Sequence, residues 1–278
     1  MNARHIRFRS VVDRAVLPAA ALLIGLSFGP PVRAADWLGG DALRGSLAPA
    51  PLRWDGVYFG GAFGVGNPHA DFGDSAHDMI SYMLRNTTLE NEQHPEDWTA
   101  LGADNGRWTS YGGFVGYNVT WDGGIVLGGE IGYNYVSSDG LGTSDSMTRR
   151  VTLTTGTDDV TITADSAIRL KDYATFRGRV GWDAGAFLPY AFLGLAVGRF
   201  NYLTNASVVV TGSDTYSNSD SNGKEDAISA GLDVGLGVDV ALTSNIFLRG
   251  EWEYLAFAPL SGIRYTSNVG RAGIGVKF

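Results

Sequence analysis

The sequence has no cysteine, and none of its apolar runs reaches the ~18 residues that a membrane-spanning helix needs. The absence of cysteine excludes a disulfide framework, thiol catalysis and cysteine-ligated metal sites. After the first thirty residues, segments with helical amphipathic periodicity are almost absent as well, which disfavours an ordinary helical soluble domain. A chain of this kind needs another source of stability, such as a closed ladder of β-strands.

Basic residues are scarce except at the N-terminus. Four arginines within the first fourteen residues precede an apolar stretch, 16–28, that is too short to span a bilayer. Val32 and Ala34 follow as the small residues of a cleavage site. This pattern predicts a signal peptide over 1–34, cleaved after Ala34. Residues 35–53, which are rich in small residues, are expected to form a periplasmic N-terminal segment.

The expected mature chain is acidic. Cleavage removes five of the 21 basic residues and one of the 29 acidic residues, which leaves 16 against 28 and a net charge of −12. Such a charge disfavours nucleic acid as a partner, because the phosphate backbone repels it. It suits a protein that exposes acidic loops to water.

From Trp54 onward, the sequence alternates between apolar and polar residues over segments of strand length. We expect eight strands, at 54–65, 108–121, 125–136, 167–182, 187–203, 226–241, 245–256 and 265–278. One face of these strands is apolar and uncharged, whereas the other carries glycine and isolated charges. The facing of the fifth strand, which is apolar on both sides, stays open.

This inside-out pattern distinguishes between two all-β architectures. A soluble β-protein buries its apolar face and seldom needs glycine at so many polar-face positions. A lipid-facing barrel needs a dry outer wall and small residues inside, where the wall curves. With 39 glycines in the chain, the pattern predicts an all-β fold, an eight-stranded antiparallel up-and-down transmembrane β-barrel over 54–278.

The connections alternate in length, which supports the same fold. The short connections are 122–124, 183–186 and 242–244, and the long ones are 66–107, 137–166, 204–225 and 257–264. Short periplasmic turns and long extracellular loops are typical of outer-membrane barrels. Within 137–166, two Val/Thr-rich segments flank a Gly-Thr-Asp-Asp turn, which predicts a hairpin that extends the third and fourth strands.

Aromatic residues gather at the predicted strand ends, as in the girdles that anchor a barrel at the headgroup level. We expect a periplasmic girdle of Trp54, Trp121, Trp182, Tyr190 and Phe278 and an outer girdle of Trp108, Tyr135, Tyr202 and Tyr254.

The predicted inner face carries five acids and five bases. They are Glu130, Asp233, Asp239, Glu251 and Glu253, with Arg177, Arg179, Arg249, Arg271 and Lys277. An eight-stranded barrel is only just wide enough for side chains to fill it, so charges inside must be paired and hydrogen-bonded. We therefore predict an interior salt-bridge network in which Arg177, Arg179 or Arg249 faces Glu130, Glu251 or Glu253. A conductance path lined by the same residues is the open alternative.

The chain offers little for catalysis or cofactor binding. The three histidines of the expected mature chain, His69, His77 and His94, all lie in the first long connection, at spacings that match no compact ligand motif. Metal or haem binding there stays open. No nucleophile with a base and an orienting acid can be placed together. We therefore expect neither an enzyme nor a bound cofactor.

Three segments together resemble a known family: Trp-Asp-Gly-Val-Tyr-Phe-Gly-Gly at 54–61, Gly-Gly-Phe-Val-Gly-Tyr-Asn at 112–118, and Val-Gly-Arg-Ala-Gly-Ile-Gly-Val-Lys-Phe at 269–278. Over about 54–278, the chain is similar to the eight-stranded outer-membrane proteins of alphaproteobacteria, often called outer-membrane immunogenic proteins or OmpA-like porin-family barrels. The resemblance implies that Ile274, Val276 and Phe278 form the signal read by the barrel-assembly machinery.

These observations favour a location in the outer membrane of a Gram-negative bacterium, among outer-membrane lipid and lipopolysaccharide. The expected role is that of a structural and surface-interaction barrel, plugged by balanced charge, with an unidentified host or surface ligand at its loops. A narrow porin for small solutes or ions is the alternative. A soluble secreted barrel that binds an apolar ligand would require the reverse facing.

Overall fold

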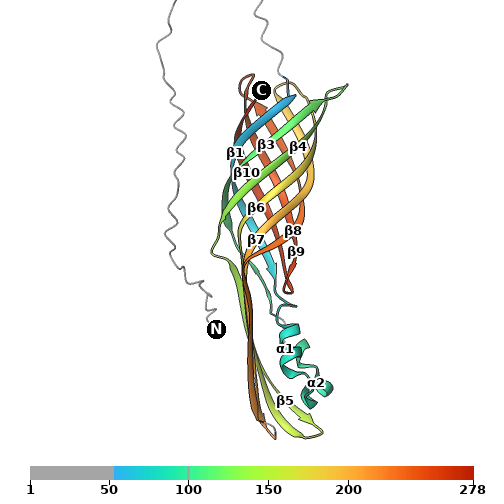
Figure 1. The fold of residues 1–278 in the computed structure, drawn as a ribbon, viewed down its shortest axis with the longest axis vertical. Coiled ribbons are helices and arrows are strands. Elements are labelled where there is room, and N and C mark those ends of the chain that lie inside the picture. Colours follow the sequence, from blue (N-terminus) through green and yellow to red (C-terminus); the bar gives the residue numbers. More distant parts are fainter. Residues whose placement is uncertain (1–52, 99–100, 214) are drawn as a thin grey trace, which may run out of the picture. The chain divides into compact units, whose positions relative to one another are not determined.

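The computed structural model describes residues 53–98, 101–213 and 215–278 (Figure 1). The predicted signal peptide and all of the predicted N-terminal segment except Arg53 lie outside these residues. None of the helices in the described ranges is long and apolar enough to cross a membrane.

Eight antiparallel strands are hydrogen-bonded in a ring. They are β1 (Gly56–Asp71), β3 (Trp108–Thr120), β4 (Ile125–Ser137), β6 (Gly156–Trp182), β7 (Phe187–Gly212), β8 (Tyr216–Ala241), β9 (Ile246–Leu260) and β10 (Ile263–Lys277). Strand β10 pairs with β1 from Tyr58 opposite Lys277 to Asp71 opposite Arg264, which closes the barrel. The eight-stranded barrel is therefore confirmed, and closure removes the unpaired edges that an open sheet would have.

The inside-out facing is also confirmed. On β10, for example, Ile274 is 53% exposed on the outer wall and Arg271 is 6% exposed on the inside, counting backbone and side chain together. On β7, whose facing the sequence left open, Tyr190 and Phe192 are buried in the interior, whereas Leu193 and Leu195 lie on the outer wall.

Short connections meet at one end of the barrel and long ones at the other, which we call the turn end and the loop end. The turn end holds the β3–β4, β6–β7 and β8–β9 turns. In the first of these, Gly123 and Gly124 have φ of +83° and +82°, which only glycine adopts without steric cost.

Beyond the loop end, three strands continue as a separate sheet. Strands β6, β7 and β8 are 27, 26 and 26 residues long, about twice the 13 residues of β3 and β4. Their outer parts pair with one another, and β5 (Leu141–Leu153) pairs with β6. We call this four-stranded part the extension sheet (Figure 1). The predicted hairpin is present as β5–β6, but the connection predicted at 204–225 is largely strand rather than loop.

The first long connection contains helices that the sequence did not predict. It holds α1 (His77–Leu84), α2 (Thr88–Gln93), a 3₁₀ turn η2 (Pro95–Asp97) and the short strand β2 (Ala103–Asn105). Thr87 caps α2, and its hydroxyl accepts the Glu90 N–H at 3.2 Å. The helices pack beside the extension sheet and bury apolar side chains, namely Met79, Ile80, Met83, Leu84 and Leu89.

Two clusters of apolar side chains occupy the inside. The turn-end cluster consists of Trp54, Tyr58, Phe114, Val126, Leu188, Tyr190, Phe192 and Phe247. The loop-end core contains Trp108, Tyr173, Phe200, Phe257 and Tyr265 and continues along one face of the extension sheet through Val160, Ile162, Val208 and Val210 to the helices.

These clusters correct part of the predicted aromatic girdles. Trp121, Trp182, Tyr135 and Phe278 are exposed on the outer wall, but Trp54, Tyr190 and Trp108 are buried inside, and Tyr202 and Tyr254 are partly buried. The buried rings fit because glycine faces them. A β-carbon at Gly66, for instance, would lie 2.3 Å from the Trp108 ring.

Candidate functional site

The middle of the barrel holds a cluster of buried charges, which we call the ionic cluster. It comprises Arg177 and Arg179 from β6, Arg249, Glu251 and Glu253 from β9, Asp233 and Asp239 from β8, Glu130 from β4 and Arg271 from β10. Every one of these side chains is at most 3% exposed. The period-two alternation of strands places them all on the inner face.

Arg177 lies at the centre of the ionic cluster. Its Nε donates to Asp233 Oδ2 at 2.6 Å and its Nη2 donates to Glu253 Oε1 at 2.5 Å. Its Nη1 lies 3.4 Å from Glu251 and 3.6 Å from Glu130. One guanidinium thus satisfies carboxylates from three different strands, which the fork of five N–H donors on arginine allows.

Two further arginines share the same pair of carboxylates. Arg249 Nη1 donates to Glu130 Oε2 at 2.6 Å, and its Nε donates to Asp239 Oδ1 at 2.8 Å. Arg179 Nη2 donates to Asp239 Oδ2 at 2.7 Å and its Nη1 lies 3.4 Å from Glu130. Closer to the loop end, Arg271 lies 3.3 Å from Glu253.

Aromatic side chains line the ionic cluster on its turn-end side. Tyr58 Oη donates to Glu130 at 2.9 Å, and Tyr190 Oη donates to Glu251 at 2.7 Å. The Arg179 guanidinium lies 3.7 Å from the centre of the Tyr190 ring, and that of Arg249 lies 4.0 Å from the Phe114 ring. Cation–π contacts and tyrosine hydroxyls thus stabilise charges that have left water.

Lys277 is not part of the ionic cluster. Its Nζ lies 4.1 Å from the Trp54 ring centre and donates to the carbonyl oxygen of Arg53, at the turn end. The structure therefore brings together nine of the ten charged residues predicted for the network. The ionic cluster therefore has five carboxylates and four guanidiniums instead of the five bases expected, because Lys277 contacts Arg53 and Trp54, which precede β1.

The centre of the ionic cluster is tightly packed. The pocket between Glu130, Arg177, Arg179, Tyr190, Phe192 and Glu251 has no volume that a water molecule could occupy. The turn-end cluster lies on one side of these residues, and the loop-end core lies on the other.

The three histidines of the first connection do not converge. His69 pairs with Asn105 at 2.8 Å, whereas His77 lies 3.5 Å from Asp97 and His94 lies 3.1 Å from Glu96. Among the residues that the structure describes, no group of three or more metal-ligating side chains could hold an ion.

Outside the barrel, the other face of the extension sheet is polar. Arg150 and Asp159 form a bidentate pair on it at 2.7 and 2.8 Å. This hydrogen-bonded guanidinium holds the pKa of the Asp159 carboxyl below its ordinary value. Thr148 and Thr161 pair next to it, with 2.9 Å between their hydroxyl oxygens.

The family model described as outer membrane protein beta-barrel domain matches residues 20–278. The chain belongs to this family. It is thus a bacterial outer-membrane β-barrel, of a family of small barrels that are generally non-enzymatic.

Individual relatives are more distant. A 22 kDa outer membrane protein of Rhizobium leguminosarum bv. viciae is 34% identical over 110 residues, which is 37% of this chain and 44% of that protein. The chain therefore spans less than half of the length of this relative.

Among solved structures, Neisserial surface protein A is 16% identical with a TM-score of 0.34, covering 81% of this chain and 100% of that one. Ail, the attachment invasion locus protein of Yersinia pestis, solved with the heparin analogue sucrose octasulfate, is 13% identical with a TM-score of 0.32, covering 80% and 99%.

Proposed function

We propose that this family member is a closed barrel that anchors the extension sheet and its helices at the bacterial surface. The observation that carries the proposal is the packing at the middle of the barrel, where Glu130, Arg177, Arg179, Tyr190, Phe192 and Glu251 leave no space between them for a water molecule. Outer-membrane barrels place short turns in the periplasm and long loops outside. In that orientation, the extension sheet lies outside the cell and outer-membrane lipid and lipopolysaccharide surround the wall. The proposal includes no catalytic role.

Purified protein in a planar bilayer is therefore expected to show no single-channel steps. The charged interior would need to open along its whole length for ions to pass, and each arginine would have to leave two or more carboxylates. A general porin reconstituted in the same bilayer supplies the positive control. Steady steps that vanish on boiling and change in Glu130→Gln would contradict the closed barrel and favour the narrow porin.

We further propose that Phe278, with Val276 and Ile274, serves as the assembly signal read by the barrel-assembly machinery. The ring of Phe278 stacks on Phe59 of β1 at 5.7 Å, and its N–H donates to the Val57 carbonyl at 3.0 Å. It is 71% exposed, so the fold buries little of it. The residue is thus available to another protein before the β1–β10 seam closes.

Phe278→Ala is expected to lower the amount of folded barrel in the outer membrane severalfold, with little change in the unfolding of the molecules that assemble. The readout is the mobility difference between boiled and unboiled membrane samples on a gel. Leu242→Ala, another exposed apolar residue at the turn end (56%), is the matched control and should assemble normally. Equal levels of both variants would count against the assembly signal.

A further inference from the structure

The polar face of the extension sheet carries in-register rows of short polar side chains that run across the strands. Thr163, Ser207 and Ser219 lie opposite one another on β6, β7 and β8, and Asp165, Asn205 and Ser221 form the next row. Neighbouring strands are ~4.8 Å apart, so each row presents polar groups at a regular short spacing. The rows are set by the strand register and not by a mobile loop.

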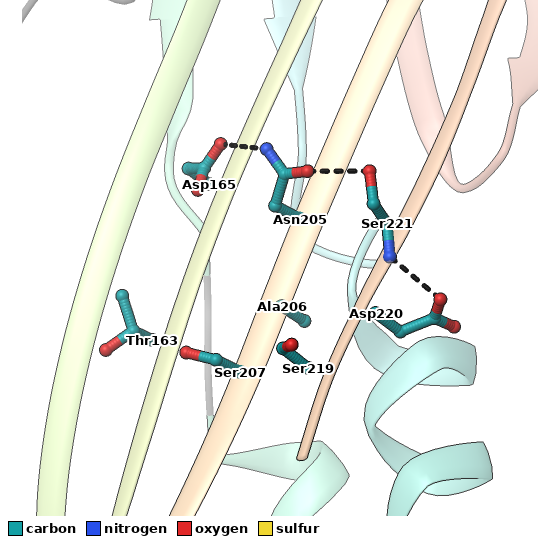
Figure 2. Close-up of a pocket in the computed structure, with 8 residues that line it drawn as sticks. All are labelled: Thr163, Asp165, Asn205, Ala206, Ser207, Ser219, Asp220 and Ser221. Atoms are coloured by element: carbon teal, nitrogen blue, oxygen red, sulfur yellow. Dashed lines mark hydrogen bonds between the residues drawn. The ribbon is translucent and has the colours of Figure 1, made fainter. Parts of the chain in front are cut away.

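The second row is a connected hydrogen-bond chain. Asn205 Nδ2 donates to Asp165 Oδ2 at 2.8 Å, and the Ser221 hydroxyl donates to Asn205 Oδ1 at 2.7 Å (Figure 2). This chain fixes the Asn205 amide in one orientation. A carboxylate, an amide and a hydroxyl are therefore held side by side before any ligand arrives, which lowers the entropic cost of binding.

An open pocket of about 400 Å³ lies over these rows. Its lining consists of Thr163, Asp165, Asn205, Ala206, Ser207, Ser219, Asp220 and Ser221. Binding pockets for small molecules start at about 300 Å³, so the volume suits one or two sugar rings. Six of its lining residues, those of the two rows, present polar side chains on this face, so an apolar ligand would leave their hydrogen bonds unmade.

We propose that this pocket binds a neutral saccharide. Hydroxyl groups of a sugar both donate and accept, and so does the lining: Asp165 accepts, whereas Asn205 and the serine and threonine hydroxyls do both. The ligand is either a sugar of the bacterial surface or one of a host glycan, which share this chemistry. The proposal rests on the proposed function in one respect, since display at the cell surface is what brings the pocket to such sugars.

The charge of the pocket excludes two other ligand classes. The ionisable side chain that it presents on this face, Asp165, is acidic, so a sulfated or phosphorylated sugar would be repelled; Asp220 pairs with Ala206 and lies on the opposite face. One carboxylate on this face, with amide and hydroxyl neighbours, is too few charges to favour a divalent cation.

The eight described lining residues include no aromatic ring on which a sugar could stack. Affinity therefore depends on hydrogen bonds, and we expect Kd on the order of 1 mM. Saturation-transfer NMR on the full barrel in detergent micelles suits this range. The probes are the neutral disaccharides maltose and lactose, a neutral core oligosaccharide released from lipopolysaccharide, and sucrose octasulfate as the anionic contrast.

The expected result is saturation transfer to at least one neutral sugar and none to sucrose octasulfate. Asn205→Ala should weaken binding at least tenfold, because it removes the group that links the row. Ser219→Ala should weaken binding less. The Ser219 side chain makes no hydrogen bond within the described part of the fold, so this variant should fold normally and can test the pocket even if Asn205→Ala does not fold. Thr161→Ala, on the same face but outside the pocket, is the matched control and should bind like the unaltered protein.

Transfer to the core oligosaccharide alone would assign the site to bacterial sugars, and transfer to lactose would assign it to host glycans. No transfer to any neutral sugar, tighter binding of sucrose octasulfate, or equal binding by Asn205→Ala, Ser219→Ala and Thr161→Ala would overturn the proposal. None of these results depends on conductance, so the closed barrel and the saccharide site can fail separately.

Discussion

Arg249→Met is expected to lower the free energy of unfolding of the barrel by about 3–5 kcal/mol. Arg249 donates to Glu130 at 2.6 Å and to Asp239 at 2.8 Å, and its side chain is 1% exposed. Methionine fills a similar volume but leaves five carboxylates facing three guanidiniums in the dry interior. Breaking one side of a buried ion pair costs more than the pair contributes, because the remaining charge loses its solvation. Urea titration in detergent micelles, followed by tryptophan fluorescence, measures the loss.

Arg264→Met provides the control for this experiment. Arg264 pairs with Asp74 at 3.0 Å, but both side chains are more than 60% exposed. Exposed ion pairs contribute about 0–1 kcal/mol, so this variant should unfold almost like the unaltered protein. Equal losses in the two variants would show that the ionic cluster is hydrated, and the closed barrel would then lose its main support.

The strand pattern made the barrel predictable from the sequence. A one-residue shift in register moves a side chain from the inside to the outside, so alternation defines the facing wherever one face is uncharged. The same phase identifies the nine charged residues of the ionic cluster. It says nothing about depth along the barrel axis, and for that reason it grouped Lys277 with residues that lie farther from the turn end.

The aromatic residues that were wrongly placed in girdles have the expected depth but the opposite facing. Trp54 and Trp108 lie at strand ends in the sequence, as girdle residues do. Their rings point inward, where Phe247 packs against Trp54 at 6.1 Å and Tyr173 packs against Trp108 at 6.3 Å. The signal that could have revealed them is glycine on the facing strand, as at Gly66.

The extension sheet and the helices could not be predicted from the sequence, for two different reasons. The outer part of β8, from Tyr216 to Lys224, is rich in Ser, Asn and Asp, which are typical of loops. It is a strand because β7 pairs with it over this length. Helices α1 and α2 have only eight and six residues, too few for a periodic pattern to stand out, and packing against the sheet stabilises them.

Trp108→Ala is expected to cost about 3–5 kcal/mol of unfolding free energy, the range for removal of a buried large aromatic side chain. Trp108 is 1% exposed in the loop-end core, and Gly66 leaves no β-carbon to fill the space that the indole vacates. Tyr82→Ala is the control, since Tyr82 is 61% exposed on α1 and contacts Arg85, and its loss should stay within about 1 kcal/mol.

The same variant tests which part of the interior closes the barrel. The loop-end core and the ionic cluster lie one after the other along the axis, so a cavity at Trp108 leaves the charged layer intact. Trp108→Ala should therefore be much less stable and still show no conductance in a planar bilayer. Single-channel steps in this variant, with none in the unaltered protein, would mean that the aromatic layer forms the seal. Because the four guanidiniums and five carboxylates of the ionic cluster remain in place in Trp108→Ala, we expect no single-channel current from this variant.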